Sequence, residues 1–316
     1  MITLKKISAL LAFQFCLFAA FAQNRYTDTS ATCIAFWKNK EYKIYQIKKT
    51  KVKYETTIEK NRSEAMYEAH IRIIDSTATG YIIEWTYKNF KTSALNEHAL
   101  NSLTNIMEGL TIRYKTDDVG SFAELINWEE VRNFAIKNYE IALKEHAQNK
   151  EFVAALDQVK SIFQSKENIE AVMIKEIQLY HTPYGVEYNK SELIQETALP
   201  NVTGGSPIPA KISYKILELD PKKDFCKVCQ NQNIDKGIAG PIIADMIKKL
   251  SGGKTQNESD IQKEIEDMEI SDINEFSFGI SSGWLSRIFF KRTTNVSKYK
   301  QIESYEISAL NNAADN

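Results

Sequence analysis

Cysteine is scarce in this sequence, which contains 4 among 316 residues. Cys16 lies in an N-terminal segment that we expect to be removed, so Cys33, Cys226 and Cys229 remain. Three thiols allow at most one intramolecular disulfide, which excludes a small disulfide-stapled scaffold. The remaining chain of about 290 residues is long enough to bury a core without such staples.

An excess of charge of either sign is also lacking, since the chain has 40 basic and 41 acidic residues. A nucleic-acid partner usually requires a strongly basic surface, so none is expected. The sequence has no HExxH motif and no glycine-rich phosphate loop between a strand and a helix. The histidines show no metal-ligand spacing; they are His70, His98, His146 and His181. We therefore expect neither a metal site nor a cofactor.

Long apolar runs are missing except at the N-terminus, where Ile7 to Phe21 follows Lys5 and Lys6 and ends in Ala20-Phe21-Ala22. This pattern is typical of a secretory signal peptide, which we assign to residues 1–22 with cleavage after Ala22. The run is shorter than the roughly 20 residues that span a bilayer. The sequence thus predicts an exported protein without a transmembrane span after cleavage, located in the periplasm, at the outer envelope or outside the cell.

After a polar leader at residues 23–40, the segment 41–126 is dominated by period-two alternation. In "MYEAHIRII" and "GYIIEWTYKNF" one face is apolar, formed by Tyr67, Ala69, Ile71, Ile73, Tyr81, Ile83, Trp85 and Tyr87. Such alternation is typical of half-buried antiparallel strands. The stretch "STATG" predicts a turn between them, and Asp117, Asp118 and Gly120 predict a hairpin. A short helix is expected at residues 96–107.

The period changes at residues 127–180, where three amphipathic segments predict a helical block. Asn127 and Glu130 fit an N-terminal capping box, which would begin the first helix. Its apolar stripe consists of Val131, Phe134, Ala135, Asn138, Ile141 and Ala142. The second and third segments run from Phe152 to Phe163 and from Ile169 to Tyr180. We expect each stripe to pack on a sheet or on another helix.

Residues 181–310 return to strand patterns and include one more helix. The prolines and glycines of "LPNVTGGSPIPA" predict an irregular loop, and "GIAGPIIADMIKKLSGG" predicts a helix at 240–250 with Pro241 near its start. Residues 257–272 are acidic and are expected to be exposed, three closing strands follow, and residues 311–316 form a tail. The fold class is therefore α+β: a single domain at 41–310 with a predominantly antiparallel sheet, curved or half-barrel in form.

The stretch "DFCKVCQNQNID" contains the pair Cys226 and Cys229, which admits three interpretations: a redox centre, half of a metal site, or part of a strand. Three residues of strand span roughly 10 Å, too far for a disulfide between the two. A redox site would place the first cysteine at a helix N-terminus, and no second CxxC completes a zinc site. We favour two strand cysteines, one of which could pair with Cys33.

Two other motifs invite functional interpretations. "GISSG" at residues 279–283 matches a nucleophile elbow around Ser281, but a strand pattern follows instead of the required helix, so a hairpin is favoured. The lysines of "KKTKVK", residues 48–53, could face an anionic membrane or lipopolysaccharide. Lysines on one face of an edge strand also protect against aggregation, and we favour that interpretation.

Several phrases resemble known proteins. The ending "AFAQ" of the signal segment and the stretches "GLTIRYKTDDVGSFAELINWEEV", "LYHTPYGVEY" and "LPNVTGGSPIPA" resemble secreted proteins of Bacteroidota-type bacteria, which have no assigned activity. The order of strands and amphipathic helices is similar, more distantly, to periplasmic lipoprotein carriers of the LolA-like half-barrel class. That resemblance implies a curved sheet that holds an apolar chain.

The first functional hypothesis is a noncatalytic exported envelope protein that binds an apolar or lipid-like ligand on a curved sheet. The helix at 240–250 would act as a lid, with ligand-lining residues Ile242, Ile243, Met246, Ile247 and Leu250. The alternative is an interaction module that binds a protein partner during envelope assembly, with no enclosed ligand. A third hypothesis is a hydrolase that acts on envelope polymers with two carboxyl groups, but no catalytic residue can be assigned from the sequence.

Overall fold

The computed structural model describes residues 25–94, 107–145, 147–148, 153, 165–199, 207–250, 265–266, 268–296 and 298–310. The expected signal peptide, the expected helix at 96–107, nearly all of the segment from Phe152 to Phe163, most of the acidic stretch and the tail at 311–316 lie outside these residues. None of the described helices is long and apolar enough to cross a membrane.

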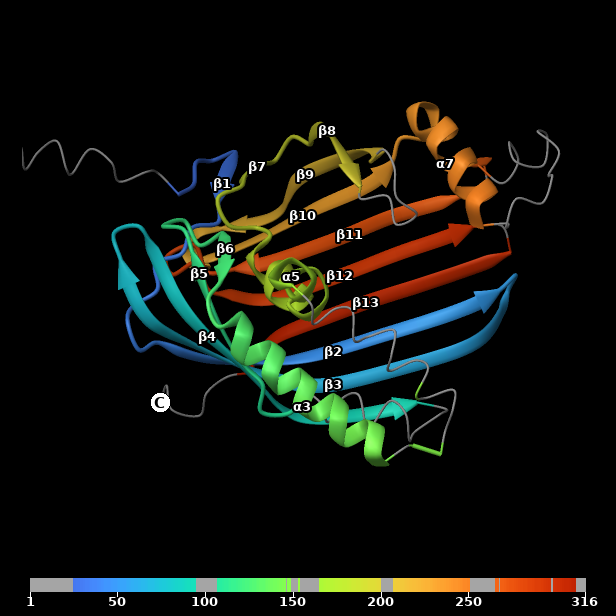
Figure 1. The fold of residues 1–316 in the computed structure, drawn as a ribbon. Coiled ribbons are helices and arrows are strands. Elements are labelled where there is room, and N and C mark those ends of the chain that lie inside the picture. Colours follow the sequence, from blue (N-terminus) through green and yellow to red (C-terminus); the bar gives the residue numbers. More distant parts are fainter. Residues whose placement is uncertain are drawn as a thin grey trace, which may run out of the picture.

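One antiparallel sheet of eleven strands forms most of the structure, in the order β6-β5-β4-β3-β2-β13-β12-β11-β10-β9-β8 (Figure 1). Nearly every strand pairs with its neighbour in sequence. The exception is the pair of β2 and β13, which joins the two halves of the chain. The strands are β2 (Tyr42–Glu55), β3 (Ile58–Thr77), β4 (Gly80–Ala94), β5 (Thr111–Thr116), β6 (Phe122–Leu125), β8 (Leu193–Leu199), β9 (Ile208–Asp220), β10 (Phe225–Ile234), β11 (Glu269–Phe278), β12 (Leu285–Val296) and β13 (Tyr299–Leu310).

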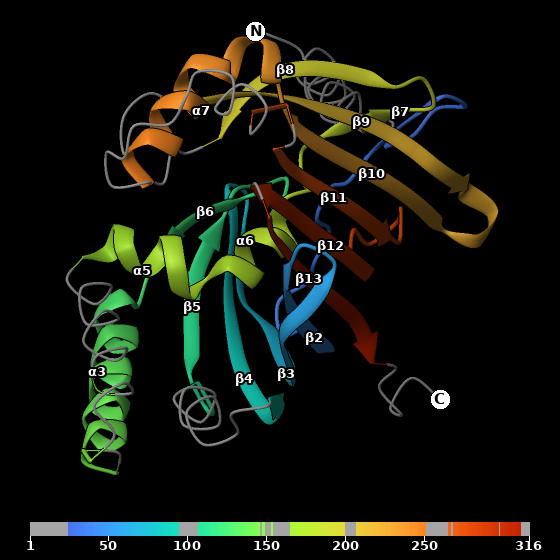
Figure 2. The same ribbon diagram turned by 90° about the vertical axis from the view of Figure 1, so that its right-hand side faces the viewer.

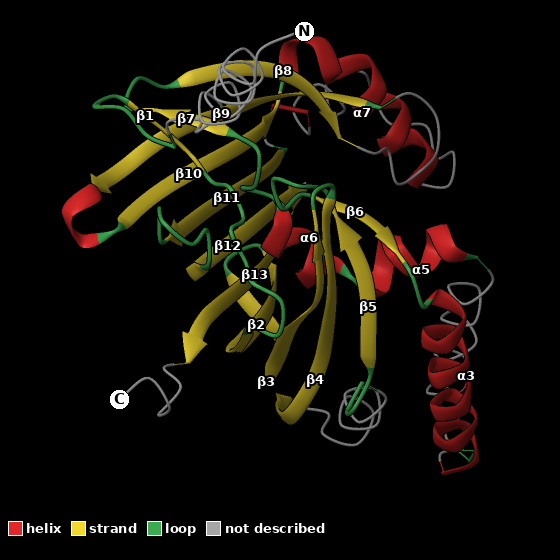
Figure 3. Cartoon of the chain, turned by 90° about the vertical axis from the view of Figure 1, so that its left-hand side faces the viewer, coloured by secondary structure: helices red, strands yellow, loops and turns green. Residues whose placement is uncertain are grey.

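The sheet curves strongly, and helices occupy its concave side (Figures 2 and 3). Helices α5 (Lys166–Met173) and α6 (Lys175–His181) lie inside the curve, and α3 (Trp128–Glu145) packs against β5 and α5. Helix α7 (Lys236–Leu250) packs against β9. Strands β1 (Ser30–Thr32) and β7 (Glu187–Asn189) form a separate pair. The predicted α+β class with a curved antiparallel sheet is confirmed.

The alternation read from the sequence decides which side chains face the helices. Seven of the eight alternating residues predicted in β3 and β4 are buried, and Tyr81 is partly buried. The turn "STATG" joins these strands and ends at Gly80, whose φ is +144°. A Cβ at this position would lie 2.0 Å from the carbonyl oxygen of Thr116, so the turn requires glycine there. The hairpin at Asp117 is also confirmed, since the Asp117 carboxylate accepts the backbone N–H groups of Gly120 and Ser121.

Aromatic side chains with polar tips fill the space between α6 and the sheet. Burying such a ring removes roughly 150–250 Å² from water, but its hydroxyl then needs a partner. Tyr45 donates to the carbonyl oxygen of Leu285 at 2.7 Å, which leaves its oxygen to accept from Tyr180 at 3.0 Å. Tyr67 donates to Glu176 of α6 at 2.9 Å. These bonds fix α6 against β2 and β3 without leaving the four side chains unsatisfied.

His181, at the last position of α6, is fully enclosed in this aromatic layer. Its Nδ1 lies 2.7 Å from the carbonyl oxygen of Gly120, which can only accept, so Nδ1 carries the proton. Nε2 then accepts from the Tyr114 hydroxyl at 2.9 Å. Burial lowers the pKa of His181 to about 4, because the hydrogen bond to Gly120 only partly offsets the loss of solvation. The imidazole is therefore neutral at physiological pH.

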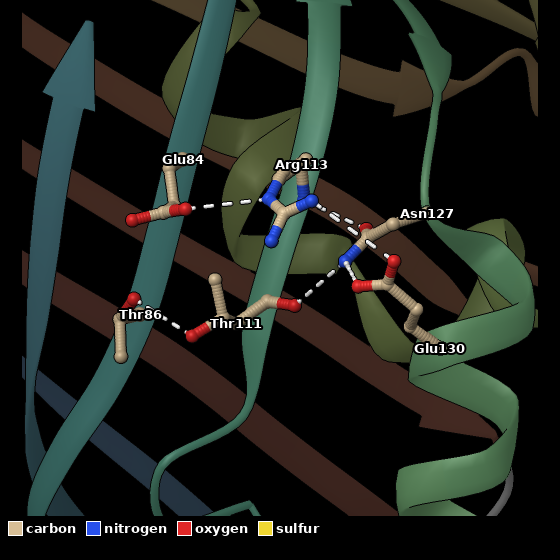
Figure 4. A network of polar contacts seen from close by, with 6 residues as sticks. All are labelled: Glu84, Thr86, Thr111, Arg113, Asn127 and Glu130. Carbon is tan, nitrogen blue, oxygen red and sulfur yellow. Dashed lines mark hydrogen bonds and ion pairs between the residues drawn. The ribbon is translucent and has the colours of Figure 1, made fainter. Parts of the chain in front are cut away.

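The first helix begins where predicted, but Asn127 does not act as expected. Its Oδ1 accepts the backbone N–H of Arg113 in β5 at 2.8 Å, and its amide donates to Thr111 and Glu130 (Figure 4). The side chain therefore ties α3 to the sheet instead of satisfying the first turn of the helix. Ile141 of the expected stripe is 44% exposed, whereas Tyr139 is buried, because α3 contacts the sheet mainly through its N-terminal half.

Two predictions for the C-terminal half are wrong. Residues 208–210 are not part of an irregular loop, because β9 begins at Ile208 and Pro209 lies opposite Ala198 of the edge strand β8. The acidic stretch is not exposed throughout, since Asp272 lies in β11 and is 6% exposed. Its carboxylate is tolerated there because Arg292 binds both of its oxygens.

The cysteine pair and "GISSG" have structural roles. Cys226 and Cys229 lie in β10, as favoured, and the three cysteines of the described part are free thiols. Burial raises the pKa of Cys226 to about 12, which is the opposite of an activated thiolate. Ser281 lies in the turn between β11 and β12, where it donates to Asp224 at 2.6 Å. No histidine accompanies it among its described hydrogen-bond partners.

Candidate functional site on the concave face

Two of the residues expected to line a ligand site, Ile242 and Ile243, belong to a small hydrophobic core. Ile243 is fully buried and Ile242 partly buried, and both pack with Ile208, Ile234, Ala239, Ile265 and Met268. The side chains of Met246, Ile247 and Leu250 lie outside the described part of the structure. The helix begins at Lys236, earlier than expected, because Asp235 accepts the N–H groups of Gly237 and Ile238. The lid role of α7 stays a prediction.

A hollow of about 340 Å³ lies near the start of α7. Its lining includes Ile194, Lys211 and Ser213, with Asn231 and Asp235 beside them. Because Ile194, Ser213 and Asn231 pair across three strands, they share the convex face of the sheet. The hollow is open and most of the residues that line it are polar or charged, so it does not resemble the enclosed pocket of a lipid carrier.

The lysines of "KKTKVK" have a different environment from the one expected. The edge-strand interpretation is wrong, because β2 pairs with β3 on one side and β13 on the other. Lys48 lies on the convex face, 3.9 Å from Glu64. The next three odd-numbered positions, Lys49, Lys51 and Lys53, point to the concave face, in line with Tyr45 and Ile47.

Strand register places these lysines at the end of rows that cross the sheet. One row runs Leu193, Tyr214, Gln230, Asn274, Phe290, Tyr305, Lys49. The next row runs Gln195, Ile212, Gln232, Asp272, Arg292, Glu303, Lys51. Six strand spacings separate β8 from β2, so each row is roughly 29 Å long. Along each strand, the concave face therefore changes within a few residues from the aromatic core at α6 to a polar surface. We call this surface the floor.

Charged side chains on this floor are joined by hydrogen bonds and ion pairs. Arg292 binds Asp272 through two hydrogen bonds of 2.7 and 2.6 Å. Glu303 accepts the Tyr305 hydroxyl at 3.0 Å and lies 3.6 Å from Lys49. The Lys49 ammonium also sits 4.8 Å from the centre of the Tyr305 ring. These contacts neutralise Arg292 and part of the charge of Lys49.

Beyond these pairs, the floor carries three further positive charges, those of Lys51, Lys53 and Lys175 of α6. We call Lys49, Lys51, Lys53 and Lys175 the lysine cluster. Partial burial lowers the pKa of Lys51, Glu303 opposes this effect, and the other three lysines add to it by repulsion. Burial alone would raise the pKa of Glu303, but the nearby lysines and the Tyr305 hydroxyl outweigh it and lower that pKa. Two described carboxylates lie at the cluster: Glu303, which lies 3.6 Å from Lys49 and acts on Lys51, and Glu176, the neighbour of Lys175 in α6.

This arrangement can hold an anion but offers little for acid catalysis. Every described carboxyl group with a shifted pKa has it lowered, whereas a general acid needs a raised one. No group of three or more metal-ligating side chains occurs among the residues that the structure describes. The sequence analysis noticed the lysines but missed the site, because Arg292, Glu303 and Lys175 are more than 100 residues away along the chain.

Comparison with known proteins gives no family. No family model matches the chain, and no curated protein matches it. Among solved structures it is similar to one titled "Lipid-protein interactions in lipovitellin", with 10% sequence identity and a TM-score of 0.41. The alignment covers 88% of this chain and 26% of the lipovitellin chain, so this chain spans about a quarter of that protein. A similarity of this degree carries no argument about function.

Proposed function

We propose that the protein is a noncatalytic, exported binding protein that holds a lipid-like ligand on the concave face of its sheet. The curved antiparallel sheet supports this proposal, as does the resemblance to LolA-like half-barrels. Export rests on the signal-peptide pattern of residues 1–22. The membership of the chain among secreted Bacteroidota-type proteins is part of the same proposal.

One observation carries the ligand assignment: apolar side chains on the concave floor are left partly exposed beside polar ones. Tyr214 and Phe290 are partly buried, and Leu193 at the end of their row is 42% exposed. Tyr214 and Phe290 pack against the edge of the main hydrophobic core. A floor that combines apolar contact area with a few polar groups is the usual lining of a small-molecule site.

Native mass spectrometry of the purified protein with an uncharged long-chain monoacylglycerol tests the proposal. We expect a one-to-one adduct that Phe290→Gln weakens, because Phe290 points to the concave face. Phe289→Gln is the matched control, since Phe289 lines a hollow on the convex face together with Lys227 and Glu275. Absence of an adduct, or equal weakening by both variants, would contradict the proposal.

A protein partner is the second candidate, and a different surface favours it. Ile194 is 65% exposed and Ile273 is 39% exposed on the convex face, in one row that crosses β8 to β11. Strand β8 is also an edge of the sheet, where a partner strand could add. Loss of partner capture from envelope extracts in Ile194→Lys, with retained monoacylglycerol binding, would assign this second role separately.

A further inference from the structure

We infer that the lysine cluster is an anion-binding site that receives the phosphate or carboxylate head of an amphiphilic ligand whose apolar part lies over Phe290 and Tyr214. This inference rests on the proposed function, because it names the chemical class of the same ligand. It assigns a role to Lys49, Lys51, Lys53 and Lys175 that a purely apolar ligand would not require.

The spacing of the lysines is the first argument. Alternate residues of a strand are roughly 7 Å apart, so Lys51 lies within a Debye length, about 8 Å at physiological salt, of both Lys49 and Lys53 on the same face of β2. Lys175 reaches the same place from α6, since its charge acts on both Lys51 and Glu303. Two elements distant in sequence therefore concentrate like charge in one place.

The cost of that arrangement is the second argument. Like charges directly opposite each other on a sheet destabilise it, whereas opposite charges stabilise it. The neighbouring row follows that rule, with Asp272, Arg292, Glu303 and Lys51 alternating in sign across four adjacent strands. The lysine cluster departs from it, because Lys49, Lys53 and Lys175 all repel Lys51 and Glu303 only partly offsets their charge. A bound anion would remove that repulsion.

The position of the cluster indicates which anion fits. Phe290 pairs with Tyr305, which in turn pairs with Lys49, so an aromatic path leads along one row to the ammonium groups. The rings of Phe290 and Tyr305 lie 5.7 Å apart. A ligand with an apolar body and one anionic end matches this path. A polyanion would meet the Glu303 carboxylate, which lies opposite Lys51, and Asp272 two strands farther along the row.

Isothermal titration of the purified protein tests the inference with four probes: inorganic phosphate, acetate, a monoacyl glycerophosphate and the monoacylglycerol of the same chain length. We expect the monoacyl glycerophosphate to bind at least about tenfold more tightly than the monoacylglycerol, as hydrogen bonds to a charged group contribute about that factor. We expect phosphate and acetate alone to bind far more weakly than the phosphate-headed lipid.

Two substitutions with opposite expected effects on affinity test whether the anion binds at the lysine cluster. Lys51→Gln should weaken the monoacyl glycerophosphate about tenfold and leave the monoacylglycerol unchanged. Glu303→Gln should strengthen it, because it removes the carboxylate between the lysines. Lys48→Gln is the matched control: it removes the same charge from the same strand but on the convex face, and it should change neither affinity.

The outcomes separate the two proposals. Equal affinity for both lipids, with no effect of Lys51→Gln, overturns the inference and leaves the proposed function standing. Binding of inorganic phosphate as tight as that of the phosphate-headed lipid supports the anion site but contradicts a lipid-like ligand. Equal weakening by Lys48→Gln and Lys51→Gln would show a general charge effect and would also overturn the inference.

Discussion

Replacement of His181 by asparagine should flatten the dependence of stability on pH. The imidazole is enclosed between α6 and the sheet, and burial lowers its pKa to about 4, against the ordinary value of 6.5. Between these values the unfolded chain binds a proton that the folded protein does not accept. Stability contributed by the neutral imidazole is therefore complete above about pH 7 and is lost as the pH falls toward 4.

The size of the effect follows from the two pKa values. A difference of 2.5 units corresponds to about 3 kcal/mol when the transition is complete, and to about 2 kcal/mol between pH 8 and pH 5. No correction for solvent screening applies, because His181 is 3% exposed. Other titrating groups contribute their own slopes, but these are common to the wild-type protein and the variant.

Urea unfolding at pH 8, 6.5 and 5 measures the difference. The wild-type protein should lose about 2 kcal/mol more than His181→Asn over this range. Tyr114→Phe is a second variant for the case in which the asparagine protein folds poorly: it removes a hydrogen bond that only the neutral imidazole can accept, so the pKa of His181 should rise and the slope should lie between those of the wild type and His181→Asn. Parallel curves for wild type and His181→Asn would refute the assignment of a buried neutral histidine.

Three further predictions concern the stability of the fold, each measured by chemical unfolding at pH 7.5. Asn127→Ala should cost about 2 kcal/mol, because it removes two hydrogen bonds to β5 and one to Glu130 of α3; an unchanged midpoint would show that α3 is held mainly by packing. Gly283→Ala should cost about 3 kcal/mol, since φ is +70° and a Cβ would lie 2.0 Å from the carbonyl oxygen of Ile34, whereas Gly237→Ala, whose nearest contact is 3.4 Å, should be neutral or slightly stabilising. Asp272→Asn should cost only about 1 kcal/mol despite its buried carboxylate, because the Arg292 side chain is 44% exposed and can turn to water; a loss above about 3 kcal/mol would mean that the pair behaves as buried.

Strand positions could be read from the sequence with good accuracy, whereas strand neighbours could not. Alternation of apolar and polar residues is a local property, so it located β4 within a few residues and the buried part of β3, although β3 begins eight residues earlier, at Ile58. The pairing of β2 with β13 joins residues about 250 positions apart, and no local pattern encodes it. The edge-strand interpretation of the lysines failed for this reason.

The same distinction explains which side chains were misjudged. His181 and Asp272 look like surface residues in sequence, and each is buried because a partner from another element satisfies it, Tyr114 for the histidine and Arg292 for the aspartate. Pro209 looks like a loop residue, yet it is tolerated in β9 where the sheet is about to end. Burial of a polar group depends on partners that only the folded chain provides.

By itself the sequence determined the faces of the strands, the absence of a disulfide scaffold and the amphipathic character of α7, because each depends on composition or on local periodicity. Only the tertiary structure decided that Lys49, Lys51 and Lys53 lie at the centre of a curved sheet, that α6 brings Lys175 to them, and that Glu303 of β13 lies among these charges. Electrostatic interaction depends on distance in space, and that distance is set by the order in which the strands pair.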